Sequence, residues 1–295
     1  METQFSCMHT HTLFCDGKDD IETMCRAAYE KKLCALGFSA HAPIYKQTGL
    51  KTDWNMNEDR LNEYISQVHA AKRRWQGRLA VYLGLEVDYI KGKRSAQDSD
   101  IKELNTDYII GSLHYLVPLN GADLFTVDGP PDELKKGLNE GFNGDAEALM
   151  HCYYDTMTEM IKTGGFDILG HADIIKKNFQ NKKFWPAESE SVRQMEIARA
   201  ASESGITVEV NTGGLNQKKT VDVYPSLTFL QHFSELKVPV IITADAHRAE
   251  HLDGHYSTAL QTIKCAGFSE HFIFFGKNNN KIIWKNVKIQ QKVLD

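Results

Sequence analysis

Short runs of β-forming residues alternate with helical patterns along the whole chain. Segment 20–32 is helical in pattern, because Ile21, Met24 and Ala28 recur on one face. The runs that predict strands are 5–8, 35–38, 80–87, 108–110, 167–169, 207–210 and 240–243. The segments that predict helices are 20–32, 57–76, 145–163, 188–204, 225–236 and 256–266. Such alternation indicates a parallel sheet. Seven strand-helix units favour a closed or nearly closed α/β barrel, with an open doubly wound sheet as the alternative.

No linker rich in Pro, Gly or Ser divides the chain, so we expect one domain over residues 1–295. Residues 115–144 carry five glycines, and we interpret them as a long loop that could act as a lid. Pro225 fits the first turn of a helix, and Gly205 fits the end of one. The tail could add a pair of strands over 272–275 and 281–284.

The composition disfavours several classes of protein. The net charge is −5 and the Lys-Lys pairs are scattered, so a protein that binds long nucleic acids is not expected. The polar N-terminus does not look like a secretory signal, and no apolar run approaches the roughly 20 residues that cross a bilayer. The six cysteines form no Cys-x-x-Cys pair and are expected to be reduced. We therefore expect a cytoplasmic protein that binds neither nucleic acid nor membrane.

Polar residues follow the predicted strands at their C-terminal ends. His9 and His11 follow the first strand, and positions i and i+2 of an extended chain point to the same side. Asp16 comes soon after them in a turn. The ends of the other six strands supply His41, Glu86, His114, His171, Asn211 and the pair Asp245 and His247. Any one of these residues has an ordinary structural explanation, but in α/β barrels this end of the strands carries the active site.

The residues at the strand ends are suited to metal binding. They comprise six histidines and three carboxylates, without cysteine, which suits zinc, iron or manganese. Nine ligands are too many for one ion. Three divalent ions that share Glu86 would use them well and leave coordination positions open to water and substrate.

The order of these motifs resembles the PHP (polymerase and histidinol phosphatase) superfamily, and within it the histidinol-phosphate phosphatases. The resemblance rests on 9–11 with Asp16 and on 39–41, 84–86, 111–114, 170–173 and 245–248. It implies a distorted (β/α)7 barrel of the TIM type with a trinuclear metal centre. One ion would take His9, His11, Glu86 and Asp245; a second, Glu86, His114 and His171; a third, Asp16, His41 and His247.

The resemblance implies a phosphomonoesterase of histidine biosynthesis that converts L-histidinol phosphate to L-histidinol and phosphate. Residues 111–114, 211–215 and 224–226 carry this narrower likeness. One departure concerns the loop after the sixth strand, where relatives often have a basic residue after Gly-Leu. Here Asn216 and Gln217 follow Leu215, and lysines come only after them.

Hydrolysis of a phosphate monoester requires a nucleophile, charge stabilisation and a proton for the leaving alkoxide. We expect Glu86 to act as the shared ligand. Asp16, His247 or a metal-coordinated water could deliver the proton. For phosphate binding the candidates are Arg248, Lys176 and Lys218, of which Arg248 is one residue past a ligand.

Two other functions stay open at this level. One is a PHP-type phosphoesterase that acts on nucleotides or another small phosphate ester. The other is a metal-binding protein without turnover, which the open coordination positions disfavour. In either enzymatic case the partner is a small phosphate ester, and the sequence does not determine the oligomeric state.

Overall fold

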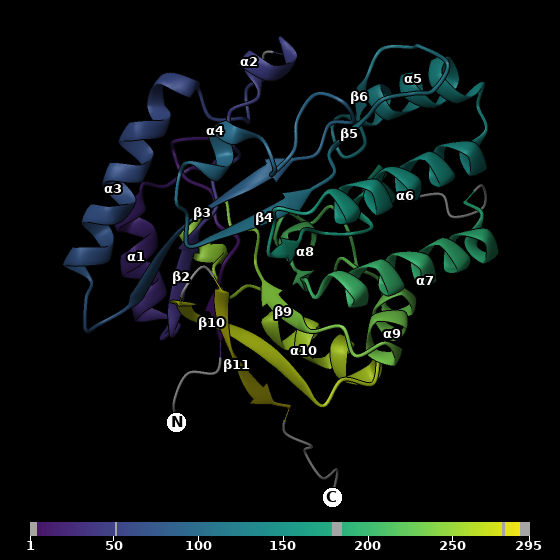
Figure 1. Ribbon diagram of the computed structural model, residues 1–295. Helices are drawn as coiled ribbons and strands as arrows, with labels where there is room; N and C mark the ends of the chain where they lie inside the picture. The colour runs from purple at the N-terminus through teal and green to yellow at the C-terminus, as the bar shows by residue number, and fades with distance from the viewer. Residues whose placement is uncertain (1–4, 51, 179–184, 279–280, 290–295) are drawn as a thin grey trace, which may run out of the picture.

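The computed structural model describes residues 5–50, 52–178, 185–278 and 281–289. Its main sheet has the strand order β1-β2-β3-β4-β7-β8-β9-β10-β11 (Figure 1). The seven predicted strands are β1 (Ser6–Cys7), β2 (Ala35–Phe38), β3 (Ala80–Asp88), β4 (Tyr108–Ser112), β7 (Ile168–Leu169), β8 (Thr207–Asn211) and β9 (Val240–Thr243). Each of these strands pairs with its neighbours in parallel. The α/β class with a central parallel sheet is therefore confirmed.

The two ends of the parallel sheet meet at their C-terminal side. A parallel bridge joins Thr10, after β1, to Ala246, after β9. In this bridge the His11 N–H donates to the Ala246 carbonyl at 2.9 Å, and the Ala246 N–H donates to the His9 carbonyl at 3.0 Å. Within the described residues, β1 and β9 share no ladder like those between the other neighbours. This one bridge thus joins the first and last parallel strands into a ring, at the end where the polar residues lie.

Figure 1 shows the helices around the outside of the strands. The longer ones are α1 (Ile21–Glu30), α3 (Leu61–Arg74), α5 (Pro131–Phe142), α6 (Ala146–Thr163), α7 (Ala187–Ser204), α9 (Leu227–Glu235) and α10 (Tyr256–Cys265). Single turns form α2 (Tyr45–Thr48), α4 (Ser99–Lys102), α8 (Gly213–Asn216) and the 3-10 helices Glu58–Arg60, Ile174–Asn178 and Ala249–His251. In the part of the chain that the structure describes, none of the helices has the length and apolarity to cross a membrane.

The hydrophobic core has two main parts. The larger part lies between the strands and the outer helices. A smaller part fills the interior of the ring with Met8, Tyr108, Ile110, Ile168, Ile241 and Phe274. The Tyr108 ring needs glycine on two neighbouring strands, because a Cβ at Gly37 or Gly84 would lie 2.4 Å from its atoms. This apolar plug forms the floor on which the polar site rests.

The C-terminal strand pair is confirmed and is longer than predicted. It consists of β10 (Glu270–Asn278) and β11 (Lys281–Lys288), which pair in an antiparallel register. Strand β10 also runs parallel to β9, and its Phe274 enters the interior cluster. The pair therefore covers the end of the ring opposite to the polar residues.

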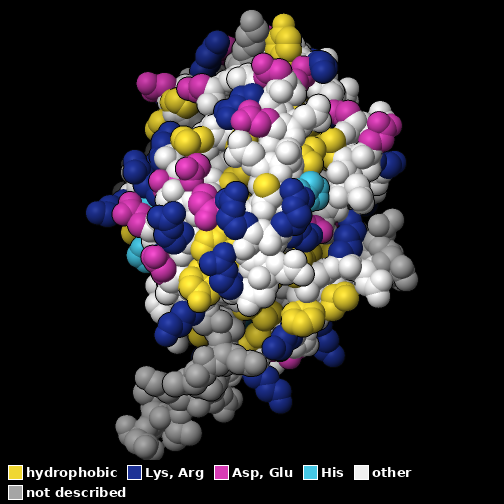
Figure 2. All heavy atoms as spheres, turned by 90° about the vertical axis from the view of Figure 1, so that its left-hand side faces the viewer, with side chains coloured by type: hydrophobic (Ala, Val, Ile, Leu, Met, Phe, Trp, Pro, Cys, Tyr) yellow, Lys and Arg dark blue, Asp and Glu magenta, His cyan; other side chains and the backbone are white. Residues whose placement is uncertain are grey.

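On the face shown in Figure 2, acidic side chains lie among the lysines and arginines.

The prediction of a long loop over 115–144 is wrong. This segment contains a short hairpin of β5 (Tyr115–Leu116) and β6 (Phe125–Thr126), followed by α5. The glycines were misleading, because two of them serve helix packing. A Cβ at Gly137 of α5 would lie 2.4 Å from the Phe125 ring, and one at Gly141 would lie 2.8 Å from Pro118.

The position predicted for Pro225 is also wrong. Helix α9 begins after the N-cap residue Ser226, and Pro225 lies before it in a cis peptide bond with Tyr224. The prediction for Gly205 is confirmed, since this residue ends α7 with a left-handed φ of 67°.

Candidate metal centre

The inner face of the ring changes from apolar to polar toward the C-terminal ends of the strands. Alternate residues of a strand point to the same side, so Gly84, Glu86 and Asp88 of β3 all face the interior. Their neighbours Leu85 and Val87 belong to the outer core instead. A buried carboxylate in such a strand is costly unless it is paired or bound to a cation.

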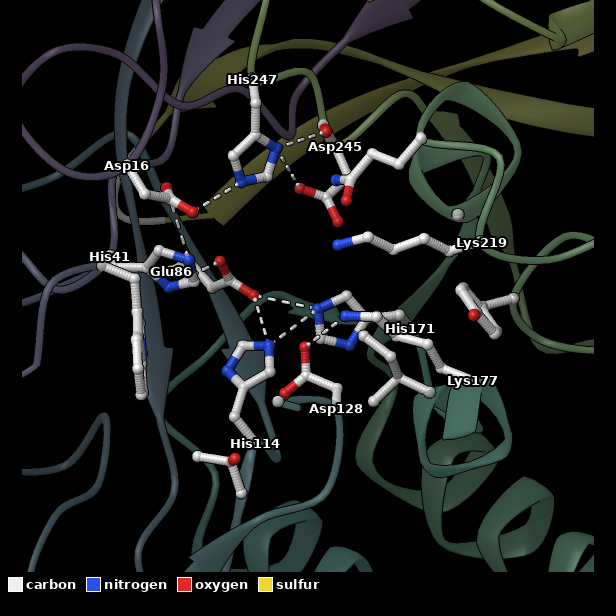
Figure 3. A pocket seen from close by; sticks show the side chains of 17 residues that line it. Asp16, His41, Glu86, His114, Asp128, His171, Lys177, Lys219, Asp245 and His247 are labelled. Carbon is white, nitrogen blue, oxygen red and sulfur yellow. Dashed lines mark hydrogen bonds and ion pairs between the residues drawn. The ribbon is translucent and has the colours of Figure 1, made fainter. Parts of the chain in front are cut away.

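Glu86 lies at the centre of the polar cluster and is 1% exposed (Figure 3). Its Oε2 lies 3.1 Å from His9 Nε2 and 3.0 Å from His41 Nδ1. Its Oε1 lies 3.1 Å from His171 Nε2 and 3.6 Å from His114 Nε2. One carboxylate therefore touches histidines that come from four separate strand ends.

Asp16 forms a second part of the cluster, at the wall of the cavity. Its Oδ2 lies 3.0 Å from His247 Nε2, and its Oδ1 lies 3.6 Å from His11 Nδ1 and 3.9 Å from His41 Nε2. Figure 3 shows His247 and Asp16 facing each other across this side of the site.

Asp245 connects these two parts of the cluster. Its Oδ1 lies 3.1 Å from His11 Nε2 and 3.7 Å from His9 Nε2. Its backbone has a φ of 46°, in the left-handed region that few residues other than glycine, asparagine and aspartate adopt. The surrounding contacts maintain this backbone conformation, which is common at functional sites.

These residues fit metal ions. Five groups of His, Asp and Glu residues could each hold an ion, because within each group the ligand atoms lie within 4.8 Å of one another. Together the five groups include all nine residues named from the sequence. Several buried atoms have no hydrogen-bond partner among the described residues, and these are His9 Nε2, His11 Nε2, His41 Nδ1, Asp16 Oδ1 and Glu86 Oε2. Buried polar atoms are rarely left without partners, so a cluster of such atoms around one space indicates a binding site for cations.

The electrostatics of the cluster are consistent with this interpretation. Burial alone would raise the pKa of Glu86, but His41, His9 and His114 outweigh it and hold the pKa well below its usual value. Burial likewise opposes the charged form of His9, and the Glu209 and Glu86 carboxylates raise the pKa of His9 well above its usual value. The charges of the carboxylates and imidazoles in this cluster therefore depend on one another.

Two further carboxylates orient the candidate ligands, and the sequence analysis did not identify them. Glu209 accepts hydrogen bonds from His9 Nδ1 at 2.8 Å and from the His171 backbone N–H at 2.6 Å. It also accepts from the Thr243 hydroxyl at 2.8 Å and the Asn211 amide at 2.9 Å. Carboxylates that hold the far nitrogen of a ligating histidine are typical of metal sites.

Asp88 has the same role for another histidine. Its Oδ1 lies 2.6 Å from His114 Nδ1, and its Oδ2 accepts from the Asn55 amide at 3.0 Å. Although burial opposes the charge, Asp88 and Glu86 raise the pKa of His114 to about 10. The signal for both acids was present in the sequence, since each alternates with apolar residues in a buried strand.

A cavity of about 200 Å³ opens above the cluster. Trp54 and Tyr224 contribute to its walls, as do two lysines, Lys177 and Lys219, and the carboxylate of Asp128. Figure 3 shows the lysine side chains extending across the cavity toward the metal-binding cluster. Burial and the nearby Lys177 lower the pKa of Lys219.

The three cations predicted from the sequence lie outside this cavity. Lys176 Nζ lies 3.1 Å from both Asp173 and Glu190, so its charge is engaged in the surrounding fold. Lys218 is exposed. Arg248 is exposed as well and lines a neighbouring recess to which the cluster residues Asp16 and His247 also contribute. The lysines that line the cavity are instead the sequence neighbours Lys177 and Lys219, and the phosphate-binding role of the three predicted cations stays a prediction.

Comparisons with known proteins agree with this arrangement. A protein of Deinococcus radiodurans assigned as a histidinol-phosphatase is 27% identical over 260 residues, which cover 88% of this chain and 92% of the relative. The histidinol-phosphatase of Bacillus subtilis is 27% identical over 270 residues, covering 86% of this chain and 97% of the relative.

Solved structures show the same fold. A Listeria monocytogenes protein assigned as a histidinol phosphatase superposes with a TM-score of 0.73 at 25% identity, covering 86% of this chain and 99% of that one. Histidinol phosphate phosphatase of Lactococcus lactis, in complex with zinc, L-histidinol and phosphate, superposes with a TM-score of 0.71 at 21% identity, covering 95% and 99%.

The model of the PHP domain matches residues 8–213, which is more than half of the chain. The matched range contains seven of the nine clustered residues, and Asp245 and His247 follow it. With its parallel strands, its histidine and carboxylate cluster and this match, the chain belongs to the PHP domain family.

Proposed function

We propose that this protein is a metal-dependent phosphomonoesterase that hydrolyses L-histidinol phosphate to L-histidinol and phosphate. The observation that carries the proposal is the convergence of six histidines and three carboxylates beneath a cavity that also holds two lysines. Full-length similarity to histidinol-phosphatases supports the choice of substrate. So does the Lactococcus lactis complex with zinc, L-histidinol and phosphate.

The proposed site holds three divalent ions, with zinc, iron and manganese as candidates. One group would be His9, His11, Glu86 and Asp245, a second Glu86, His114 and His171, and a third Asp16, His41 and His247. The contacts of Glu86 with five histidines support its place as the shared ligand. When bound, divalent ions in such a site supply a hydroxide nucleophile at neutral pH and offset charge on the phosphoryl oxygens.

Lys177 and Lys219 are proposed to bind the phosphate group. Both side chains line the cavity above the cluster. An ammonium group binds phosphate as a point charge, and in a partly buried cavity its effect is stronger than in water. These lysines would stand in for the basic residue that the loop after β8 lacks at positions 216 and 217.

Asp16 and His247 are proposed to handle the proton. His247 Nε2 and Asp16 Oδ2 lie 3.0 Å apart at the wall of the cavity. Because both residues are also proposed ligands, the proton would be carried by an atom of either side chain that the ion leaves free, and would pass to the alkoxide as the ester bond breaks. Glu86 contributes by position, because its two oxygens face different histidines.

A panel assay with purified protein tests the proposal. Its substrates are L-histidinol phosphate, nucleoside monophosphates and a phosphodiester, and metal analysis is done on the same sample. We expect the highest kcat/KM for L-histidinol phosphate and a metal content near three ions per chain. A preference for nucleotides would instead indicate another phosphoesterase of the family, and full metal loading without turnover on any substrate would indicate a non-catalytic metal-binding protein.

A change of Glu86 to Gln tests the shared-ligand role. Because the amide cannot offer the same negative charge to neighbouring cations, we expect Glu86→Gln to lower both metal content and kcat. The drop in kcat should be at least 100-fold, beyond the 10- to 100-fold typical of residues behind the ligands. The measurements are elemental analysis and steady-state kinetics. Full activity with full metal loading would contradict the role.

A further inference from the structure

The cavity contains one carboxylate that the candidate metal centre does not use. Four acidic side chains line it, namely Asp16, Glu86, Asp128 and Asp245. All but Asp128 belong to the groups of residues whose ligand atoms lie close enough to share an ion. Asp128 comes from the segment after β6, outside the parallel strands.

Asp128 is paired with a cavity lysine. Its Oδ2 accepts a hydrogen bond from Lys177 Nζ at 3.1 Å, and the two side chains are partly buried, at 22% and 17% exposure. No other ion pair to the Asp128 carboxylate occurs among the described residues. Figure 3 shows the carboxylate beside His114 and His171, facing the same space as the lysine. The cavity therefore presents a negative and a positive group side by side.

This charge pattern matches a phosphate ester of an amino alcohol. In L-histidinol phosphate the ammonium group sits on the carbon next to the CH2 that carries the ester oxygen. A site that binds the phosphate group of this substrate therefore also has the positively charged ammonium group of the substrate close by. An unpaired ammonium in a partly buried site costs free energy, and a carboxylate removes that cost. The imidazole is mostly neutral near pH 7 and has less need of such a partner.

We propose that Asp128 binds the ammonium group of the leaving alcohol, and that it makes the enzyme select phosphate esters of amino alcohols. Lys177 binds the phosphate and holds the Asp128 carboxylate in place beside it. Asp128 takes no part in bond breaking; it sets specificity by orienting the alcohol half of the substrate. This inference rests on the function proposed above.

The test compares two substrates in two proteins. The substrates are L-histidinol phosphate and its analogue in which hydrogen replaces the amino group. In the wild-type protein kcat/KM should favour the amino ester. In Asp128→Asn the preference should fall by on the order of 10- to 100-fold, as expected for loss of a hydrogen bond between charged groups. Because Asp128 also contacts Lys177, the readout is the ratio of the two kcat/KM values rather than either value alone, and metal analysis with circular dichroism shows that the variant is folded and metal-loaded.

The control variant is Asp123→Asn, an exposed acid in the same hairpin that does not line the cavity. It should keep the full preference. A second measurement does not depend on turnover. In calorimetry, L-histidinol should bind Asp128→Asn more weakly than wild type, whereas inorganic phosphate, which meets Lys177 without the Asp128 charge, should not bind more weakly.

The outcomes separate this inference from the proposed function. If the wild type hydrolyses neither ester, the proposed function fails. If the wild type prefers the amino ester and Asp128→Asn keeps that preference, the function stands and the role of Asp128 is refuted. Loss of metal from Asp128→Asn would also refute it, because Asp128 would then support the metal centre rather than the alcohol.

Discussion

Glu209 shows how much a single buried side chain can organise in this site. It is fully buried and receives hydrogen bonds from four groups, among them His9 Nδ1 and the backbone of His171. His9 and His171 are candidate ligands of two different ions. A change at Glu209 should therefore disturb both positions without removing any ligand.

We expect Glu209→Gln to lower zinc affinity or activity by roughly 10- to 100-fold, since partners behind metal ligands typically contribute that much. Zinc binding measured with a competing chelator provides the check. The matched control is Glu190→Gln, another buried acid, which bonds Tyr154 and Lys176 away from the cluster. The control should lose stability and keep its zinc affinity. Equal zinc affinity in wild type and Glu209→Gln would rule out the positioning role.

Lys219 gives a prediction for the dependence on pH. Burial and Lys177 lower its pKa, so it loses its charge at a lower pH than an ordinary lysine. The KM for a phosphate ester should therefore rise as the pH increases through this lowered pKa. Lys219→Arg should abolish the rise, because arginine stays charged throughout.

The control for this prediction is Lys218→Arg, since the exposed Lys218 does not line the cavity. It should leave the pH profile of KM unchanged. The same alkaline rise in Lys219→Arg as in the wild type would assign the phosphate contact to another group.

At this scale the sequence was informative about some residues and silent about others. Strand ends and ligand types were enough to name the nine residues that the structure brings together. Glu209 and Asp88 were not predicted, because both lie within strands rather than after them. Each nevertheless alternates with apolar residues of its strand. Which lysine of a pair lines the cavity could not be predicted, because Lys176 and Lys177 lie in a 3-10 turn, Ile174–Asn178, of which only Lys177 lines the cavity.

Among the secondary-structure elements, α1 begins with a side-chain cap. Asp20 accepts a hydrogen bond from the Thr23 backbone N–H at 2.7 Å, and this bond lowers the pKa of Asp20. We expect Asp20→Ala to lower the free energy of unfolding by about 1 kcal/mol, as is typical for the loss of such a cap. Denaturant unfolding measures the change. Asp20→Asn keeps a side-chain acceptor and should stay close to wild type; an equal loss in both variants would contradict the cap.

The strands and long helices were predictable because each carries a clear period. Strands β2 and β9 have the predicted bounds, and the other five predicted parallel strands differ by at most two residues at an end. The region of β5, β6 and α5 was not predictable in the same way. Its hairpin interrupts the alternation of strands and helices, and its helix carries Gly137 and Gly141, residues that a helical pattern disfavours.

For the molecule as a whole, the cluster of buried imidazoles and carboxylates links metal binding to folding. Removal of metal leaves buried atoms without partners, which costs free energy. We expect a chelator to lower the melting temperature by roughly 10 °C, since saturating ligand contributes about 4 kcal/mol. Circular dichroism measures the shift.

Zinc should restore the melting temperature of the chelated protein, and magnesium should not, because imidazole ligands suit the softer ion. A melting temperature that does not change on chelation would argue against a metal centre that supports the fold.

The sequence could not predict how the strands close into a ring. Alternation predicts parallel neighbours, but the bridge between Thr10 and Ala246 depends on the curvature of the whole sheet. The same holds for β10, which reaches the ring through its pairing with β9.

The apolar plug that contains Tyr108 and Phe274 closes one end of the interior of the ring. Substrate, water and both products would reach and leave the cluster through the cavity above it. In the proposed reaction the phosphate product keeps the contacts with the metal ions and the cavity lysines that bind the phosphate group of the substrate. Accumulated phosphate would then occupy the same form of the enzyme that fresh substrate seeks, and the rate in a crowded cell would follow how quickly phosphate is cleared.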